Sequence, residues 1–351
     1  MSFRRWVSII SFAAIIILLV ASWKDILHAW RLLEQVNLLI LSLLIPLQFA
    51  SYYASGEILA SFLRSKGELK DVSRMEVARF SLEFNFVNHI LPTGGLSGAS
   101  YANWRFKHMG VPVARVTLAN LLRFLVTFGV FIIFLFIAVF ILALDGNVNR
   151  VTLVFASTLS TLIIAGSFFL VFVVSSLPRL RGCGSWFTRT VNGLTRRLLR
   201  RSRPVVSEER VHHFLGLMHQ DYVEVRKSPA QLQAPFMWAV IFTLLEVSMF
   251  LVTFASLQTF VNPAAVLIAY GFAGFAAVFV ATPGGAGAYE AVMISFLSGA
   301  GIPQGTAIAG VLLTRVILIV VTIVSGYIFY QLALMKYGKG RQLTEVKPPA
   351  S

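Results

Sequence analysis

We expect this sequence to fold as an all-α polytopic membrane protein with an inverted-topology repeat, in which each half contains a re-entrant helical hairpin broken by Gly and Pro. Of its 351 residues, 57% are hydrophobic and 13% are charged, which is more apolar surface than a soluble core of this length can bury. A Gly/Pro motif occurs twice within apolar sequence. Lys and Arg gather in particular loops, so the path through the membrane can be traced.

The repeated motif reads Pro92-Thr93-Gly94-Gly95 in the first half and Pro283-Gly284-Gly285-Ala286-Gly287 in the second. The two copies lie 191 positions apart, and eight of the 39 positions from Phe84 to Leu122 are identical at this offset. Roughly three identities are expected from composition alone. We interpret the match as an internal duplication. Paired hydrophobic segments interrupted by Gly and Pro are typical of transporter binding sites.

An apolar stretch from Val7 to Trp23 precedes the first half. Arg4 and Arg5 flank it and no clean small-residue cleavage site follows, so we interpret it as a retained transmembrane helix rather than a signal peptide. The predicted segments are residues 1–37 (first helix and outer loop), 38–144 (first repeat, with a hairpin at 75–109), 145–177 (linking transmembrane helix), 178–231 (basic cytoplasmic loop), 232–335 (second repeat, with a hairpin at 263–300) and 336–351 (cytoplasmic tail).

The first hairpin is predicted to enter and leave the membrane by the cytoplasmic face. Ser73 and Glu76 form the pattern of a capping box that opens its first limb, Met75 to Leu91. The second limb, Ser97 to Met109, is also shorter than the ~20 residues of a full span. Both outer ends of the hairpin are rich in Lys and Arg, which indicates the cytoplasm. The span from Pro112 to Leu144 then crosses outward.

The loop from Pro178 to Gln231 holds eleven Arg and Lys residues against four Asp and Glu residues. Apolar residues recur at helical spacing in two stripes: Phe187, Val191, Leu194 and Leu198, and then Val211, Phe214, Leu215, Met218, Tyr222 and Val225. Basic amphipathic helices usually lie on a membrane surface, where anionic lipids attract them. Nucleic acid is the weaker alternative and is not expected as a partner.

The second half is predicted to run in the opposite direction. Ser228 and Pro229 supply an N-cap and first-turn residue for a span from Leu232 to Phe260. Its hairpin limbs, Pro263 to Thr282 and Ala288 to Ala300, contain no Lys or Arg, as expected of a hairpin that dips in from outside. The last span, Gln304 to Met335, returns to a basic cytoplasmic tail. Two broken hairpins that meet near the midplane are typical of alternating-access transporters.

The candidate site lies where the two hairpins meet. Irregular glycine-rich backbone is tolerated at membrane depth only where protein covers it or a polar cavity borders it, and a helix that starts there presents its positive end to a phosphate. Ionisable side chains within the membrane are functional candidates by default. The candidate substrate-binding residues are Asn85, Asn88, His89, Pro92, Gly94, Gly95, Arg123, Glu246, Pro283, Gly284, Gly285, Gly287, Glu290 and Arg315.

Each of these candidates also has a purely structural interpretation. The arginines and glutamates could neutralise one another as ion pairs, and this is the favoured interpretation for Glu57, near the cytoplasmic end of its helix. Glu83 is left open between the two. Asn85, Asn88 and His89 share one helix face, and polar side chains in membranes more often hydrogen-bond between helices than line a pocket.

These motifs resemble the flippase-like membrane domain of the lysylphosphatidylglycerol synthase family. The resemblance rests on Asn88-x-x-x-Pro92-x-Gly94-Gly95 with Gly110 and Arg123, and on Pro283-Gly284-Gly285-x-Gly287-x-x-Glu290 with Gly301 and Arg315. It covers nearly the whole chain. It implies a multi-pass protein of a prokaryotic cytoplasmic membrane, with the inverted hairpin repeat described above, that moves phospholipids such as aminoacyl-phosphatidylglycerol between leaflets.

The sequence departs from the family in two respects. Many members have an acidic residue and then an arginine just after the first motif, whereas Ala99 and Ser100 stand here, which weakens the case for a lysyl-lipid substrate. Bifunctional members carry a soluble aminoacyl-transferase domain after the membrane part. The sequence ends at Ser351 and contains no such transferase domain, so we do not expect this chain to synthesise lysyl-lipid.

The sequence therefore predicts a lipid flippase or related transporter of a phosphate-bearing amphipathic substrate. We expect no catalytic residues, cofactor or metal, because no Asp-x-Asp, Ser/His/Asp or zinc-like pattern occurs and Cys183 is the single cysteine. The expected location is the inner cell membrane, with both termini cytoplasmic. The alternatives are an enzyme subunit or accessory protein that acts on a lipid-linked sugar, and a scaffold that recruits a partner through the basic loop. A homo-oligomer is left open.

Overall fold

The computed structural model describes residues 36–91, 96–144, 150–199, 207–279, 282 and 285–337, and these form α-helices, 3₁₀ turns and loops. Five helical segments are long and apolar enough to cross a bilayer: Leu38–Ser65, Val113–Ile141, Ser157–Val174, Pro229–Ser256 and Gln304–Tyr337. The prediction of an all-α polytopic membrane protein is thereby confirmed. The predicted first helix, Val7 to Trp23, lies outside the described residues.

The helix boundaries of the two halves follow the same offset as the repeated motif. The first half contains α3 (Leu38–Ser42), α4 (Leu44–Ser65), α5 (Arg74–Ile90), α6 (Leu96–Lys107) and α7 (Val113–Leu144). The second half contains α11 (Gln233–Ser256), α12 (Pro263–Phe279), α13 (Ala288–Gly299) and α14 (Gln304–Tyr337). The starts of α7 and α14 lie 191 residues apart.

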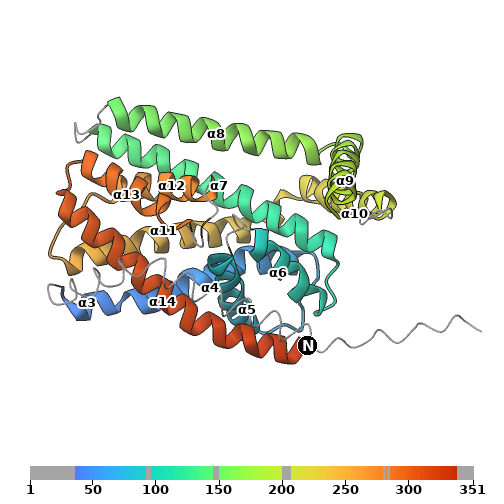
Figure 1. Ribbon diagram of the computed structural model, residues 1–351, viewed down its shortest axis with the longest axis horizontal. Helices are drawn as coiled ribbons and strands as arrows, with labels where there is room; N and C mark the ends of the chain where they lie inside the picture. The colour runs from blue at the N-terminus through green and yellow to red at the C-terminus, as the bar shows by residue number, and fades with distance from the viewer. Residues whose placement is uncertain are drawn as a thin grey trace, which may run out of the picture.

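Each half packs its last helix against the other half. Helix α14 lies along α5, α7 lies along α12, and α4 packs against α11. In Figure 1, α4 and α14 run in one direction along the bundle and α7 and α11 run in the other. The helix pair α5 and α6 lies toward one end of the bundle, and the helix pair α12 and α13 lies toward the other.

Glycines allow close approach where the halves cross. A Cβ atom added to Gly326 of α14 would lie 2.4 Å from the Cβ of Phe86 and 3.0 Å from the backbone oxygen of Leu82, both on α5. A Cβ atom added to Gly271 of α12 would lie 1.8 Å from the ring of Phe131 on α7. Because lipid tails are as apolar as Leu, helices associate in a bilayer through such close packing.

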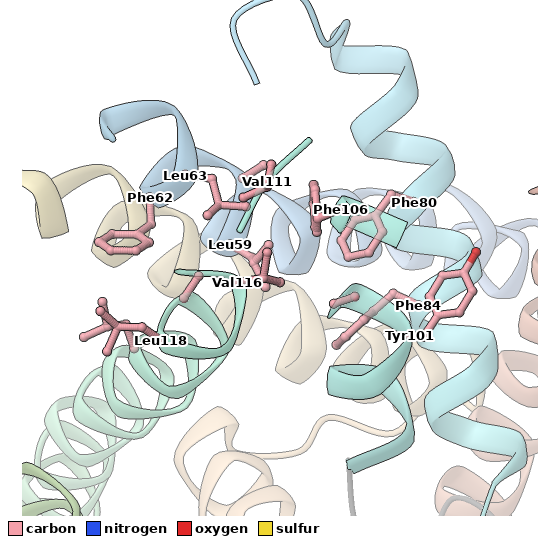
Figure 2. Close-up of a cluster of buried hydrophobic side chains, with 14 of the residues drawn as sticks. Leu59, Phe62, Leu63, Phe80, Phe84, Tyr101, Phe106, Val111, Val116 and Leu118 are labelled. Carbon is pink, nitrogen blue, oxygen red and sulfur yellow. The ribbon is translucent and has the colours of Figure 1, made fainter. Parts of the chain in front are cut away.

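The first helix pair is anchored by an aromatic cluster (Figure 2), to which α4, α5, α6 and α7 all contribute. The rings of Phe80 and Phe106 have centroids 4.6 Å apart, and both side chains are almost fully buried. Leu59 and Phe62 of α4 and Leu118 of α7 extend the same cluster. This packing holds α5 in position, and with it the helix face that carries Asn85, Asn88 and His89.

The starts of α5 and α11 differ in detail from the prediction. Ser73 accepts a hydrogen bond from the backbone N–H of Glu76 at 3.2 Å, as predicted. The carboxylate of Glu76, however, accepts from Lys336 Nζ and Tyr337 Oη of α14, which ties α5 to that helix. Pro229 opens a 3₁₀ turn (Pro229–Leu232) before α11 begins at Gln233.

The basic loop forms helices at one end of the bundle (Figure 1): α9 (Leu177–Leu199), which follows α8 (Arg150–Val174), and α10 (Glu208–Lys227). The apolar stripe of α10 packs on the protein, with Met218 and Val225 buried in the cluster of the first helix pair. Asp221 forms an ion pair with Arg115 of α7 at 3.1 Å. The larger exposed apolar side chains lie on α9, where Trp186 is 70% exposed and Phe187 53%, against 39% for Leu217 of α10.

Candidate functional site

A cavity of about 360 Å³ lies where α4, α5, α7, α11, α12, α13 and α14 meet. Of the predicted site residues, it is lined by Asn85, Asn88, His89, Arg123, Glu246, Gly285 and Arg315. Side chains from both halves thus converge on one space, as the duplication predicts. Pro92, Gly94, Gly95, Pro283 and Gly284 lie outside the described residues.

Arg123, on α7, has no carboxylate partner in the part of the chain that the structure describes. Its Nη1 donates to the hydroxyl of Ser55 at 3.0 Å. Its guanidinium carbon lies 4.6 Å from the ring centre of Phe84 and 5.3 Å from that of Phe124. Cation–π contacts of this kind stabilise a guanidinium but leave its charge in place, so Arg123 can still bind an anion.

Arg315, on α14, is held by an ion pair. Its Nε donates to Glu290 Oε1 at 2.8 Å, and its guanidinium carbon lies 4.3 Å from the ring centre of Tyr289. The other oxygen of Glu290 accepts from the backbone N–H of Gly287 at 2.7 Å. Gly287 has φ of +90°, which only glycine adopts readily. The Gly-x-x-Glu part of the motif therefore caps α13 and joins it to α14.

Glu246, on α11, is held by hydroxyl groups. One oxygen accepts from Ser51 of α4 and the other from Tyr270 of α12 at 3.3 Å. Within the described chain, no Lys or Arg forms an ion pair with it. Both of these hydrogen-bond donors are neutral, and Arg315, which lines the same cavity, supplies a positive charge that acts on this carboxylate.

The amide face of α5 also reaches the cavity. Asn85 donates to the carbonyl of Ser81 at 2.8 Å, and His89 Nδ1 lies 2.8 Å from the carbonyl of Asn85. Asn88 Oδ1 is buried without a hydrogen-bond partner among the described groups. All three residues line the cavity. This agrees with the interpretation that they form part of a pocket.

The two other glutamates considered above form ion pairs away from the cavity. Glu57 binds Arg64 with both oxygens, at 2.6 and 3.1 Å. Glu83 accepts from Arg105 at 3.2 Å and from Tyr101 at 2.7 Å. For these two residues the geometry favours the structural interpretation.

Sequence reasoning missed a polar stripe on α4. Gln48, Ser51, Tyr52 and Ser55 follow the spacing i, i+3, i+4, i+7, so they share one helix face, and Gln48, Tyr52 and Ser55 line the cavity. Gln48 Nε2 donates to the carbonyl of Leu318 at 2.8 Å. The spacing of these residues within an apolar helix was the signal that could have found them.

Gly285, of the second motif, lies at the cavity wall. Its φ is +70°, and an added Cβ atom would lie 2.2 Å from that of Ala277. The backbone N–H of Gly285 donates to the carbonyl of Thr282 at 3.1 Å. Both the backbone angle and the close contact therefore require glycine at this position.

Comparison with known families matches residues 6–326 to the model described as the lysylphosphatidylglycerol synthase TM region. No curated protein matches the chain, and no solved structure matches it. The family match includes both Gly/Pro motifs and every residue that lines the cavity. The chain therefore belongs to the family of the lysylphosphatidylglycerol synthase transmembrane region.

Proposed function

We propose that this protein moves a phosphate-bearing lipid between the leaflets of the cytoplasmic membrane and is not itself an enzyme. The observation that carries the proposal is the guanidinium of Arg123, which forms no ion pair with any described residue and lies at the wall of a cavity to which both halves contribute. A phosphodiester would supply the missing negative charge through charge-assisted hydrogen bonds. The cavity is at the lower end of the range for ligand sites, so it fits a headgroup whose acyl chains remain in lipid.

The remaining site residues would support this headgroup. Arg315 lines the same cavity and forms an ion pair with Glu290, so we assign it a second, weaker contact with the phosphate. Asn85, Asn88 and His89 would contact polar headgroup atoms. Glycine backbone of the two motifs would let the headgroup approach closely.

For the architecture, we propose an inverted repeat whose two helix pairs are re-entrant hairpins that enter from opposite faces. The opposite directions of α4 and α11 and the placement of the helix pairs toward opposite ends of the bundle support this (Figure 1). The basic α9 would lie on the cytoplasmic, anionic lipid surface, and both termini would be cytoplasmic.

This topology can be tested by cysteine labelling in a Cys183→Ser background. Lys70→Cys, in the loop after α4, is expected to react with an impermeant maleimide only in inside-out vesicles. Phe260→Cys, in the exposed loop after α11, is expected to react only in right-side-out vesicles. Labelling of both positions from the same side would exclude the inverted repeat.

The function is tested by leaflet exchange in liposomes that contain the purified chain. The probes are phosphatidylglycerol, its lysyl ester and a polyprenyl phosphate, each with a fluorophore in the hydrophobic part that an impermeant reductant bleaches. We expect at least one lipid to be exchanged, and Arg123→Gln to slow that exchange by about tenfold or more, the effect of one lost charged hydrogen bond. Arg189→Gln, on exposed α9, is the matched control.

Folding of each variant is checked by gel filtration and thermal unfolding. If folded wild-type protein exchanges none of these lipids, with or without a proton gradient, the proposed function is wrong. A related transporter or an enzyme subunit would then have to explain the cavity.

A further inference from the structure

Two carboxylates depend on one arginine at the cavity. Glu290 forms an ion pair with Arg315 at 2.8 Å. The positive charge of Arg315 also acts on Glu246 of α11, whose hydrogen bonds come from the hydroxyls of Ser51 and Tyr270. Carboxylates that share a cation oppose each other's ionisation. Of the two, Glu290 is held as an anion by a guanidinium, whereas the hydrogen-bond donors of Glu246 are neutral.

A bound phosphodiester would change this balance. Arg123 and Arg315 line the cavity, and together with Glu246 and Glu290 they form a set of side chains whose formal charges cancel. The headgroup of the proposed function adds a negative charge at the two arginines. In a site of low dielectric constant, that charge repels the carboxylate of Glu246 and competes with it for Arg315. A proton on Glu246 would restore neutrality.

The surroundings of Glu246 suit both protonation states. The hydroxyls of Ser51 and Tyr270 donate to the carboxylate, and a hydroxyl can also accept a hydrogen bond. A protonated Glu246 could therefore donate to one of them without movement of a helix. Gln48, which is 1% exposed and lies on the same face of α4 as Ser51, lines the cavity as well. Its Oε1 has no hydrogen-bond partner among the described groups and is a further acceptor.

Most other titratable groups around Glu246 cannot take up a proton. The surrounding helices place the following at the cavity: Tyr52 of α4, Arg123 of α7, Tyr270 of α12, Tyr289 of α13 and Arg315 of α14. Tyrosine and arginine already carry their protons at neutral pH. Helix α3 and the turn Pro229–Leu232, which also pack against α11, have no titratable side chain.

His89 of α5 is the competing proton acceptor, because it lines the same cavity. Its Nδ1 lies 2.8 Å from the carbonyl of Asn85, and the positive charge of Arg315 acts on its ring. Protonation of His89 would create a charge near an arginine, whereas protonation of Glu246 removes a charge. Within a membrane, removal of a charge is the less costly change.

We infer that Glu246 takes up a proton when the phosphodiester binds, so that the lipid anion and the proton cross the membrane together. The O–H bond forms at a carboxylate oxygen of Glu246 with a proton from the solution on the side where the lipid enters. It breaks when the phosphodiester leaves on the other side, and the proton is released there. This inference rests on the proposed function and names its coupling ion.

The first test measures proton uptake on binding. Short-chain, ether-linked phosphatidylglycerol is titrated into the purified protein by calorimetry, in buffers that differ in their heat of ionisation. The difference in heat gives the number of protons taken up per bound lipid, whatever the affinity. Wild-type protein is expected to take up about one proton per lipid at mildly alkaline pH, and fewer at acidic pH, where the free carboxylate is already protonated. Binding without uptake at every pH, or no binding of this lipid, would overturn the inference.

The proton is then assigned to a residue. Infrared difference spectra of wild-type protein should gain the C=O stretching band of a protonated carboxylic acid when this lipid binds, a band that protonated histidine and an ether-linked lipid lack. In Glu246→Gln, uptake per bound lipid should fall to about zero. His89→Gln, and Glu57→Gln outside the cavity, should keep the wild-type value. Proton uptake without the infrared band would place the proton on His89 and overturn the assignment, as would full uptake by folded Glu246→Gln.

A transport measurement separates this inference from the proposed function. Liposomes carry a pH gradient, valinomycin with equal potassium on both sides holds the membrane potential at zero, and protein-free liposomes report passive movement. Labelled phosphatidylglycerol should collect in the leaflet that faces the alkaline solution, up to about tenfold for a gradient of one pH unit. If the protein exchanges the lipid but leaves it evenly distributed, proton coupling is wrong and lipid exchange stands. If it exchanges none of the probe lipids, both proposals fail.

Discussion

The two helix pairs occupy corresponding places in their halves but carry their charges differently. The pair α5 and α6 contains the Glu83–Arg105 ion pair, and Glu76 joins it to Lys336 at the end of α14. The pair α12 and α13 is packed with apolar side chains, and its ion pair, Glu290 with Arg315, is at the cavity. At the offset of 191 residues, Glu83 corresponds to Gly274, Arg105 to Phe296 and Glu290 to Ala99.

This difference shows how a duplicated fold can produce one asymmetric site. In the second half, a carboxylate at the start of α13 neutralises the arginine of the following helix. In the first half, Ala99 stands at that position, and the acid of this helix pair is Glu83 on α5, which accepts a hydrogen bond from Arg105. Consequently, no carboxylate of the described chain neutralises Arg123, and its positive charge is available to an anionic ligand.

The largest effect is expected from Glu83→Gln, after which Glu76, at 3.6 Å, is the remaining acidic partner of the buried Arg105 among the described residues. Removal of one partner of a buried pair costs about 3 kcal/mol of folding free energy, so the midpoint of thermal unfolding should fall clearly. The double variant Glu83→Leu, Arg105→Phe imitates the apolar second pair and should recover much of the loss. Equal stability of wild type and Glu83→Gln would show that the ion pair does not anchor the first helix pair.

A second comparison concerns the two glycines at the crossings of the halves. Gly326→Ala would bring a methyl group against backbone and Cβ atoms of α5, and we expect a loss of about 2 kcal/mol from overpacking. Gly271→Ala meets the far end of the Phe131 ring, which can shift, so its effect should be smaller. Thermal unfolding in one detergent ranks the two variants, and the reverse order would contradict the packing account.

Ala99→Glu transplants the acid of the second half into the first. If the new carboxylate reaches Arg123, lipid exchange should fall by about tenfold while the unfolding midpoint changes little. Ala99→Gln has similar size without the charge and is the matched control. Comparable losses in both variants would point to a steric effect rather than neutralisation.

The smallest effect is expected from Lys336→Gln. Lys336 is 65% exposed in its contact with Glu76, and exposed ion pairs contribute about 0–1 kcal/mol. Its removal should shift the unfolding midpoint by no more than a degree or two and leave exchange unchanged. A large shift would indicate that the end of α14 matters more for the first helix pair than Arg105 does.

The sequence was sufficient to predict the helices that carry the site. Pro112 and Pro303 each precede a long apolar run. Helices α7 and α14 begin at the residue directly after these prolines. Ser73 was predicted as an N-cap because Glu76 follows it by three positions, and its hydroxyl does accept from the backbone N–H of Glu76. Such signals are local, so no tertiary information is needed to interpret them.

The remaining features depend on packing between distant segments. Periodicity predicted an apolar stripe on α10 but could not show that it faces α7 rather than lipid. It gave equal weight to Arg123 and Arg315, because the distance from Arg315 to Glu290 is set by the fit of α13 against α14. The hydroxyl groups of Ser51 and Ser55 gained their importance only from the side chains of two other helices.

The most direct test compares removal of the unpaired charge with removal of the paired charges. Lipid exchange is measured for Arg123→Gln and for the double variant Arg315→Gln, Glu290→Gln, both confirmed as folded. The account predicts that Arg123→Gln loses exchange by about tenfold or more, whereas the double variant stays within about fivefold of wild type. Normal exchange by Arg123→Gln together with loss in the double variant would contradict it and would place the anion site in the second half.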